Sequence, residues 1–166
     1  NLNNRRFLGA KTKLLDFIYE TINKEFKYDK QSFLDLFAGT GVVGYKFSDS
    51  FANIYTNDLL IHNFTALNAF FGSEKIDKNL LKIEIQNCNQ IKGQENYYSK
   101  HFGGNFFSND NAKKIGSIRS HIDLLNLSDR TRDCLITSLV YAADKVANTV
   151  GHYDAFRRGS EISNPL

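Results

Sequence analysis

The sequence predicts an α/β fold with a mainly helical second half. Strand and helix patterns alternate over residues 11–71, and a glycine-rich turn stands between a strand and a helix. No strand pattern of comparable strength follows Asp58. Alternating strands and helices build a parallel sheet with helices on its faces. The 166 residues are 42% hydrophobic, with 14 Phe and 8 Tyr, which indicates a packed globular chain.

The first half of the chain carries the alternating patterns. Leu15, Ile18 and Ile22 recur at the spacing of one helical face. The apolar run 32–37 leads into glycines, as a buried strand does when it feeds a tight turn. The expected elements are a helix over 11–26, a strand over 32–37, a helix over 41–50, a strand over 52–56 and a helix over 59–71.

The second half predicts three helices and one intervening loop. Apolar residues lie on one face of 110–126 and of 129–147, and Ser128 is a good N-cap for the last helix. Residues 75–92 have a weaker helix pattern. The aromatic, glycine-containing segment 97–107 is expected to be a loop.

Charge, cysteine content and hydropathy narrow the class of protein. No apolar run is long enough to span a bilayer. Cys88 and Cys134 are isolated, which fits a reducing cytosol and argues against a disulfide framework or a cysteine metal cluster. A net charge of +3 is compatible with a nucleic-acid partner but too small to argue for one alone. The chain begins with Asn1 and contains no Met, so we expect a fragment of a longer reading frame.

A G-x-G-x-x-G motif, formed by Gly39, Gly41 and Gly44, stands between the first expected strand and the next helix. Glycines at this place let the backbone approach a ligand closely, at the positive end of a helix. In this context the motif predicts a nucleotide-type site. A glycine turn that merely packs the strand against the helix is the alternative.

Two acidic residues favour one kind of ligand. Asp35 precedes Gly39 by four residues, and the loop offers no Lys or Arg to a phosphate. A carboxylate there repels phosphate and attracts an ammonium group, so Asp35 favours S-adenosylmethionine over a dinucleotide. Asp58, at the end of the second expected strand, is placed to accept both ribose hydroxyls. A simple helix N-cap is the alternative for Asp58.

These residues resemble the Dam-type DNA methyltransferases, which modify the exocyclic amino group of adenine. Three segments carry the resemblance: the Phe-x-Gly-x-Lys stretch at 7–11, the D-x-F-x-G-x-G loop at 35–41, and the pair Asn57-Asp58. The resemblance implies a Rossmann-like S-adenosylmethionine-dependent methyltransferase fold, present here in part.

The resemblance also implies roles for individual residues. Phe7 would lie near the adenine end or the methionine tail of the cofactor. Lys11 would reach the methionine carboxylate, and Asp35 would hold the ammonium group. An ordinary solvated lysine is the alternative for Lys11. The expected cofactor-binding residues are Phe7, Lys11, Asp35, Phe37, Gly39, Thr40, Gly41 and Asp58.

The sequence lacks the catalytic tetrapeptide of this family, Asp/Asn-Pro-Pro-Tyr/Phe, which holds the extruded adenine. The segment 164–166 has Leu where the second Pro is required, and it follows no strand pattern, so we interpret it as a chance dipeptide. No catalytic residue is assigned. We expect a fragment that ends before the catalytic strand and is inactive alone.

In the family, the target-recognition region lies between the cofactor half and the tetrapeptide. We therefore expect residues 1–94 to bind S-adenosylmethionine and residues 95–166 to form a mainly helical DNA-recognition region. Cations suit phosphates, and Asn suits adenine edges; a solvated helix end and tail is the alternative. The expected DNA contacts are Lys145, Asn148, Thr149, His152, Arg157 and Arg158.

The sequence thus predicts a fragment of a cytoplasmic, adenine-specific DNA methyltransferase that acts on double-stranded DNA in a restriction-modification system. A cognate restriction endonuclease would belong to the same system without forming a stable complex. Neither a metal nor a membrane is expected. The alternatives are a non-catalytic module that binds S-adenosylmethionine or DNA, and an NAD-dependent oxidoreductase.

Overall fold

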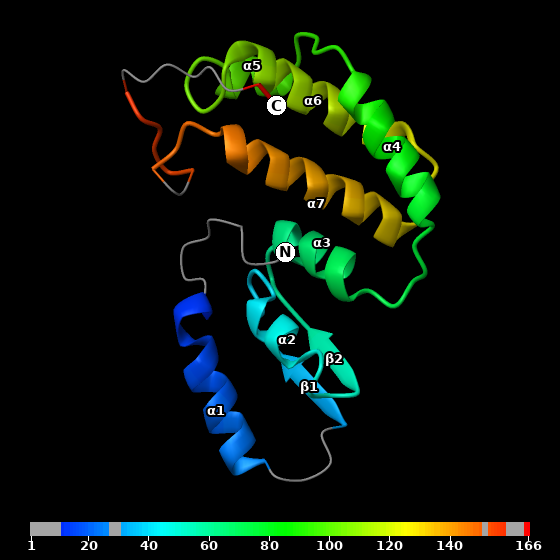
Figure 1. Cartoon of the computed structure of the whole chain (residues 1–166). Helices are drawn as coiled ribbons and strands as arrows, with labels where there is room; N and C mark the ends of the chain where they lie inside the picture. The colour runs from blue at the N-terminus through cyan, green and yellow to red at the C-terminus, as the bar shows by residue number, and fades with distance from the viewer. Residues whose placement is uncertain (1–10, 27–30, 151–152, 159–164) are drawn as a thin grey trace. The chain divides into compact units, whose positions relative to one another are not determined.

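The computed structural model describes residues 11–26, 31–150, 153–158 and 165–166. The chain divides into two compact units, Asn1–Ser73 and Glu74–Leu166, which are treated separately below (Figure 1). This division falls earlier in the chain than the expected boundary between residues 94 and 95. The expected functional assignment of the two parts stays a prediction.

The first unit is a small α/β unit (Figure 1). Its elements in chain order are the short 3-10 helix η2 (Lys11–Leu14), α1 (Leu15–Glu25), β1 (Ser32–Asp35), α2 (Val42–Phe47), β2 (Asn53–Thr56) and α3 (Ile61–Phe71). The two strands pair in parallel, with Phe33 opposite Ile54 and Asp35 opposite Thr56. Parallel pairing requires a crossover, which α2 supplies. The expected alternation and the small parallel sheet are confirmed.

One face of the sheet is packed, and the other is bare. Phe33 and Ile54 contact the core around Phe47, whose side chain is fully buried. The rings of Phe33 and Phe47 stack with centroids 4.6 Å apart. The next residues along the strands, Leu34 and Tyr55, are 55% and 56% exposed. Parallel sheets are usually covered on both faces, so this unit has an unusually open apolar surface.

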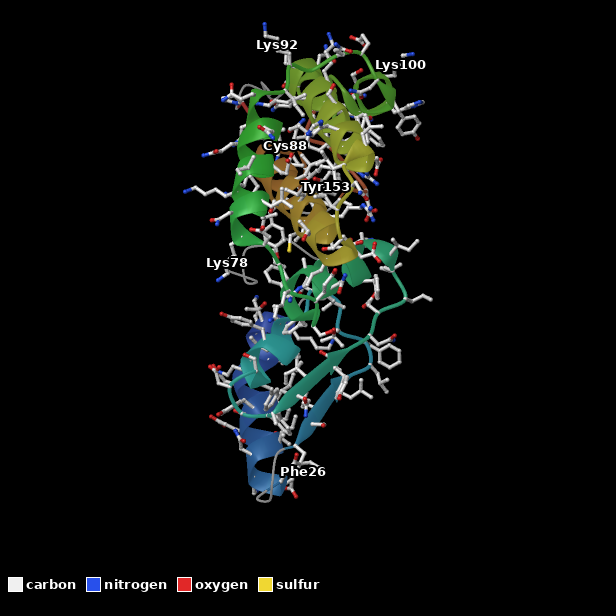
Figure 2. The ribbon with its side chains drawn as sticks, turned by 90° about the vertical axis from the view of Figure 1, so that its right-hand side faces the viewer. Phe26, Lys78, Cys88, Lys92, Lys100 and Tyr153 are labelled. Atoms are coloured by element: carbon white, nitrogen blue, oxygen red, sulfur yellow. The ribbon has the colours of Figure 1, made fainter. Side chains whose placement is uncertain are left out.

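The second unit is helical. It contains α4 (Lys78–Gln90), α5 (Tyr97–Phe102), α6 (Asn109–Leu124) and α7 (Asp129–Val146). Cys88 of α4 packs with Ile118 and Ile122 of α6 and with Leu135 of α7 (Figure 2). The Ser128 side chain accepts a hydrogen bond from the backbone N–H of Thr131, which confirms the expected N-cap of α7.

The expectation of a loop over 97–107 is wrong for residues 97–102, which form α5. The helix begins with a reciprocal cap. The Asn96 side chain accepts from the Ser99 backbone N–H, and the Ser99 hydroxyl accepts from the Asn96 backbone N–H at 3.0 Å. The aromatic residues that suggested a loop instead pack along this short helix, as Tyr98 and Phe102 do with ring centroids 5.7 Å apart.

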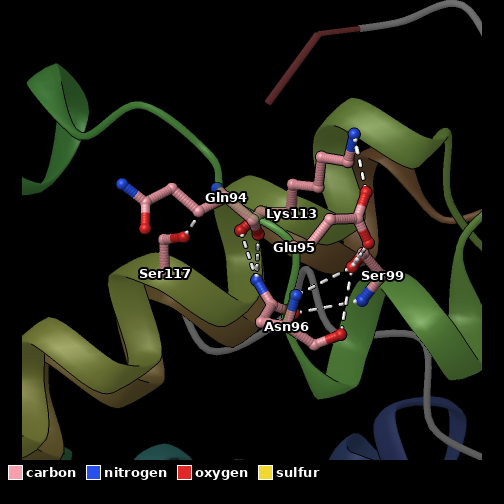
Figure 3. Close-up of polar contacts among 6 residues, drawn as sticks. All are labelled: Gln94, Glu95, Asn96, Ser99, Lys113 and Ser117. Atoms are coloured by element: carbon pink, nitrogen blue, oxygen red, sulfur yellow. Dashed lines mark hydrogen bonds and ion pairs between the residues drawn. The ribbon is translucent and has the colours of Figure 1, made fainter.

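Hydrogen bonds fasten the segment before α5 to α6 (Figure 3). The Asn96 side-chain amide donates to the carbonyl oxygens of Gln94 and Lys113, both at 2.8 Å. Gly116 lies beneath the Asn96 carboxamide, and a Cβ at this position would overlap that group. A Cβ on Gly93 would likewise overlap the α6 backbone. The loop therefore reaches α6 only because these two residues have no side chain.

Gly116→Ala should destabilise the helical unit. Alanine in a helix interior normally gains about 1 kcal/mol over glycine. Here the added methyl group would displace Asn96, and overpacking of this kind costs about 1–3 kcal/mol. We expect a net loss, measured as a lower midpoint in urea unfolding. Ser120→Ala, at an exposed position of the same helix, is the control and should not lower the midpoint. An unchanged or raised midpoint for Gly116→Ala would contradict the role given to Asn96.

Candidate cofactor site

The glycine loop follows β1 directly and turns into α2. Gly39 and Gly41 have positive φ angles of 54° and 79°, in the left-handed region that favours glycine. The Gly41 N–H donates to the Ala38 carbonyl at 2.8 Å, which closes the turn. Gly41 is then the N-cap of α2. The two glycines thus reverse the chain within a few residues and open the N-terminus of a helix beside the strand end.

The third glycine of the motif has a packing role. A Cβ on Gly44 would lie 3.3 Å from the Thr56 Cγ2 atom and 3.4 Å from the Ile54 Cγ2 atom, both in β2. These distances are tight for carbon atoms. Gly44 therefore allows α2 to lie close against the strand, as the third glycine of such motifs does.

The loop is joined to the end of β2 by a short series of hydrogen bonds. The Asn57 N–H donates to the Asp35 carbonyl at 2.8 Å, and the Ala38 N–H donates to the Asn57 carbonyl at 2.9 Å. The Asn57 side chain donates to the Leu36 carbonyl at 3.0 Å. The parallel pairing thus continues past the strands and fixes the loop against Asn57-Asp58.

The Asp58 carboxylate lies at this junction and accepts three hydrogen bonds. Its Oδ2 accepts from the Gly39 N–H at 2.8 Å. Its Oδ1 accepts from the Leu60 N–H at 2.9 Å and from the Asn63 Nδ2 at 3.0 Å. Helix α3 begins later, with Leu60 as its N-cap, so Asp58 is not the cap residue of that helix.

These contacts favour the ionised form of Asp58. Partial burial raises the pKa of the carboxyl, but the hydrogen bonds from Leu60, Asn63 and Gly39 and the nearby charge of His62 together lower that pKa below its usual value. Asp58 is therefore anionic at neutral pH. An ionised carboxylate has about four acceptor positions, so capacity remains on Oδ2.

Asp35, the second acid, lies in a less favourable environment for its charge. Burial is the largest influence and raises the pKa of the Asp35 carboxyl. The Phe37 backbone N–H and the charge of Lys11 lower this pKa, whereas the charge of Asp58 raises it. The net result is a pKa above the usual value. The structure thus brings Lys11, Asp35 and Asp58 within electrostatic reach of one another. A cationic ligand group would relieve the two carboxylates.

Two large apolar side chains close to the loop in sequence are exposed: Phe37 lies within it, and Leu59 follows Asp58. Phe37 is 82% exposed and Leu59 is 94% exposed. Thr40, in contrast, is buried within the loop. Exposed large apolar groups around a polar site are typical of a ligand-binding surface. Phe7 lies outside the residues that the structure describes.

Sequence reasoning missed Asn63. Its side chain is 1% exposed and contacts Asp58 from inside α3. The available sequence signal was weak: one of two Asn residues within the mostly apolar stretch 59–71, five residues after the acid.

The predicted DNA-contacting residues fall into two groups. Lys145, Arg157 and Arg158 are exposed, and their role stays a prediction. The other described residues hold a turn. Asn148 donates its side-chain amide to the carbonyls of Asn105 and Arg157, both at 2.9 Å, and Thr149 is buried. His152 lies outside the described residues.

Other classes of site have little support in the described part of the chain. No group of three or more His, Cys, Asp or Glu side chains there could hold a metal ion. Likewise, none of the described helices is long and apolar enough to cross a membrane.

A βαβ unit with a glycine loop and an acid at the end of its second strand is typical of domains that bind nucleotide-type ligands. The chain belongs to the family described as D12 class N6 adenine-specific DNA methyltransferase, whose sequence profile matches residues 7–165. Enzymes of this kind transfer a methyl group and need a methyl donor. The Dam-type resemblance drawn from the loop and its flanking segments is thereby confirmed.

Curated relatives support the same family. The chain is 29% identical to the Type II methyltransferase M.NlaIII of Neisseria lactamica, over 95% of this chain and 50% of that protein. It is 32% identical to the modification methylase StsI of Streptococcus sanguinis, over 91% of this chain and 26% of the relative. The Type II methyltransferase M.CviAII of Paramecium bursaria Chlorella virus 1 is 28% identical over 93% of this chain and 50% of its own. The chain thus spans half or less of these relatives. No solved structure matches it.

Asp35→Asn should slightly stabilise the first unit at neutral pH. The pKa of Asp35 is raised by folding, so the ionised carboxyl opposes folding at neutral pH, and this cost disappears as the pH falls through the folded-state pKa. Asparagine removes the cost. The gain should stay below about 1 kcal/mol because water screens a half-buried group.

The measurement is thermal unfolding at several pH values between about pH 4 and pH 8. This range includes neutral pH, where Asp35 is ionised, and the acidic pH values at which a carboxyl with a raised pKa becomes protonated. The variant should exceed the wild type most at the neutral end, and the difference should shrink toward acid. Asp49→Asn, at an exposed position, is the control. A variant less stable than the wild type at neutral pH would contradict the electrostatic description of Asp35.

Proposed function

We propose that this chain is the S-adenosylmethionine-binding part of an adenine-specific DNA methyltransferase with a Rossmann-like fold. The observation that carries the proposal is the pair of carboxylates, Asp35 and Asp58, beside a glycine loop that has no cation of its own. Such a loop suits a ligand with an ammonium group and a ribose, and without phosphate.

Each part of the cofactor finds a chemically suitable group at the loop. The half-buried Asp35 carboxylate would bind the methionine ammonium, and Lys11 would bind the methionine carboxylate. A ribose hydroxyl would donate to Oδ2 of Asp58, where acceptor capacity remains. Gly39 and Gly41 would admit the methionine part close to the backbone, and Phe37 and Phe7 would pack beside the cofactor.

A nicotinamide dinucleotide fits these residues less well. Its pyrophosphate would lie at the N-terminus of α2, near two carboxylates whose repulsion the helix dipole only partly offsets. The family assignment also favours a methyl donor.

The proposed reaction is methyl transfer to the exocyclic amino group of adenine in double-stranded DNA. The tetrapeptide that would hold the flipped adenine is absent from this sequence, so we propose the activity for a protein in which this chain is joined to that segment. The bare sheet face at Leu34 and Tyr55 is suited to packing against further chain. A non-catalytic module that binds S-adenosylmethionine or DNA is the second candidate.

The relatives suggest the biological setting. They are named Type II methyltransferases and modification methylases, so we propose a role in a restriction-modification system, with a cognate endonuclease acting on the same DNA. The protein would work in the cytoplasm, where such DNA lies. Within the helical unit, Lys145, Arg157 and Arg158 would contact phosphates, while Asn148 and Thr149 would hold the turn that presents them.

Calorimetry with S-adenosylhomocysteine and with NAD tests the cofactor proposal. The wild-type chain should bind S-adenosylhomocysteine and not NAD. Asp58→Ala and Asp35→Asn should each weaken binding about tenfold or more, since a hydrogen bond to a charged group contributes about 1.5–3 kcal/mol. Asp49→Asn is the control and should bind as the wild type does. Binding of NAD alone would overturn the proposal.

Replacing both Arg157 and Arg158 with Ala should weaken DNA binding without changing cofactor affinity. Log affinity falls as log salt concentration rises. Each lost phosphate contact should make this negative slope shallower by about 0.9. Fluorescence anisotropy with a labelled duplex at several salt concentrations gives the slope. Lys24→Ala, in the first unit, is a control that removes one positive charge from a residue outside the expected DNA contacts. An unchanged slope in the double variant would exclude these arginines from the DNA surface.

A further inference from the structure

Asn63 is the most deeply buried polar side chain in the described part of the first unit, at 1% exposure. It lies in α3 among apolar neighbours on the buried face, Ala66 and Leu67. A buried amide costs free energy unless its polar atoms are hydrogen-bonded, and Asn is a weak helix former. An apolar side chain would suit this position better, so the benefit of Asn63 must come from a specific contact.

That contact is the Asp58 carboxylate. The Asn63 Nδ2 donates to Asp58 Oδ1 at 3.0 Å, whereas the Asn63 Oδ1 is buried and has no hydrogen-bond partner among the residues that the structure describes. An ionised carboxylate only accepts hydrogen bonds, so it fixes the amide with its NH2 group toward Asp58. The amide thus serves as a donor to a charge while one of its own acceptors is left unsatisfied.

Asn63 is also the side-chain member of the donor set around Asp58. The other two donors are the backbone N–H groups of Leu60 and Gly39, which are placed by the chain turn and by the glycine loop. Leu60 and Asn63 both bind Oδ1, which leaves Oδ2 to the loop and to a ligand. Rotation of the carboxylate would break all three bonds together.

We propose that Asn63 is a positioning residue of the cofactor site, whose buried amide orients the Asp58 carboxylate and keeps it ionised toward the glycine loop. The role in cofactor binding rests on the function proposed above. The hold on Asp58 is a separate property and can be measured without a cofactor.

The charged groups around this carboxylate set the expected pH behaviour. The charge of Asp58 disfavours the Asp35 anion, the charge of Lys11 favours the Asp35 anion, and His62 favours the Asp58 anion. Loss of the amide donor removes one of the influences that lower the pKa of Asp58. A second acid in place of Asn63 would add a like charge at hydrogen-bonding distance.

Asn63→Leu keeps the branched shape and the number of heavy atoms of the side chain and removes the donor. We expect the pKa of Asp58, followed by the carboxyl carbon-13 shift in NMR, to rise, and S-adenosylhomocysteine to bind about tenfold more weakly at neutral pH. Leu67→Ala is the matched control, because it opens a cavity in the same helix but leaves the donors of Asp58 in place. It should lower the melting temperature without moving the pKa of Asp58.

Asn63→Asp gives a second readout that a packing role would not produce. At pH 8 the two acids should repel each other, and binding should be weaker than in Asn63→Leu. Toward about pH 6, where one acid of such a pair becomes protonated, the new carboxyl group can donate to Asp58, and binding should recover. The wild type should show no such gain toward acid. This variant also serves if Asn63→Leu fails to fold.

The inference is overturned if Asn63→Leu and Leu67→Ala weaken binding equally while the pKa of Asp58 stays at its wild-type value. A pH profile of Asn63→Asp parallel to that of the wild type would overturn it as well. If the wild type does not bind S-adenosylhomocysteine, the proposed function fails, and the carboxyl titration still decides whether Asn63 holds Asp58.

Discussion

The hydrogen bond from the Gly39 N–H to the Asp58 carboxylate is the constraint on which the first unit depends. It joins the loop after β1 to the residue after β2, so the two strand ends and the start of α3 keep one relative position. The positive φ of Gly39 turns its N–H toward the acid, and Gly44 lets α2 pack close enough for the loop to reach it. Sheet, loop and site are therefore one arrangement.

Local patterns predicted the part of the fold that local forces determine. The apolar run 32–37 and the glycines after it predicted a strand and a tight turn. Both signals are local, because they depend only on residues that are neighbours in the sequence. The helices around Ile118 and Leu135 were readable for the same reason. Their ends were placed a few residues too far in several cases, since fraying and capping depend on contacts that periodicity does not encode.

The features that sequence reasoning missed depend on distant residues. Helix α5 is capped by Asn96, whose amide also donates to a carbonyl of α6. Aromatic composition does not encode this contact, and it suggested a loop. Asn63 belongs to no recognisable sequence motif. Its importance follows from its hydrogen bond to Asp58, which the fold brings to 3.0 Å from its amide nitrogen. Asn148 has the right chemistry for reading a base, yet its amide holds two backbone carbonyls, because the turn that it occupies closes on Asn105. Residue type predicted which groups a side chain can bind, and tertiary contacts determine which of those groups it binds in the fold.

The bare face of the two-stranded sheet has a consequence for the behaviour of this chain in solution. Leu34 and Tyr55 present apolar side chains beside strands that each pair on one side only within the described residues. Open strand edges next to exposed apolar surface are a template for self-association and aggregation. We therefore expect this face to promote association of the isolated chain, and a polar substitution there to reduce it.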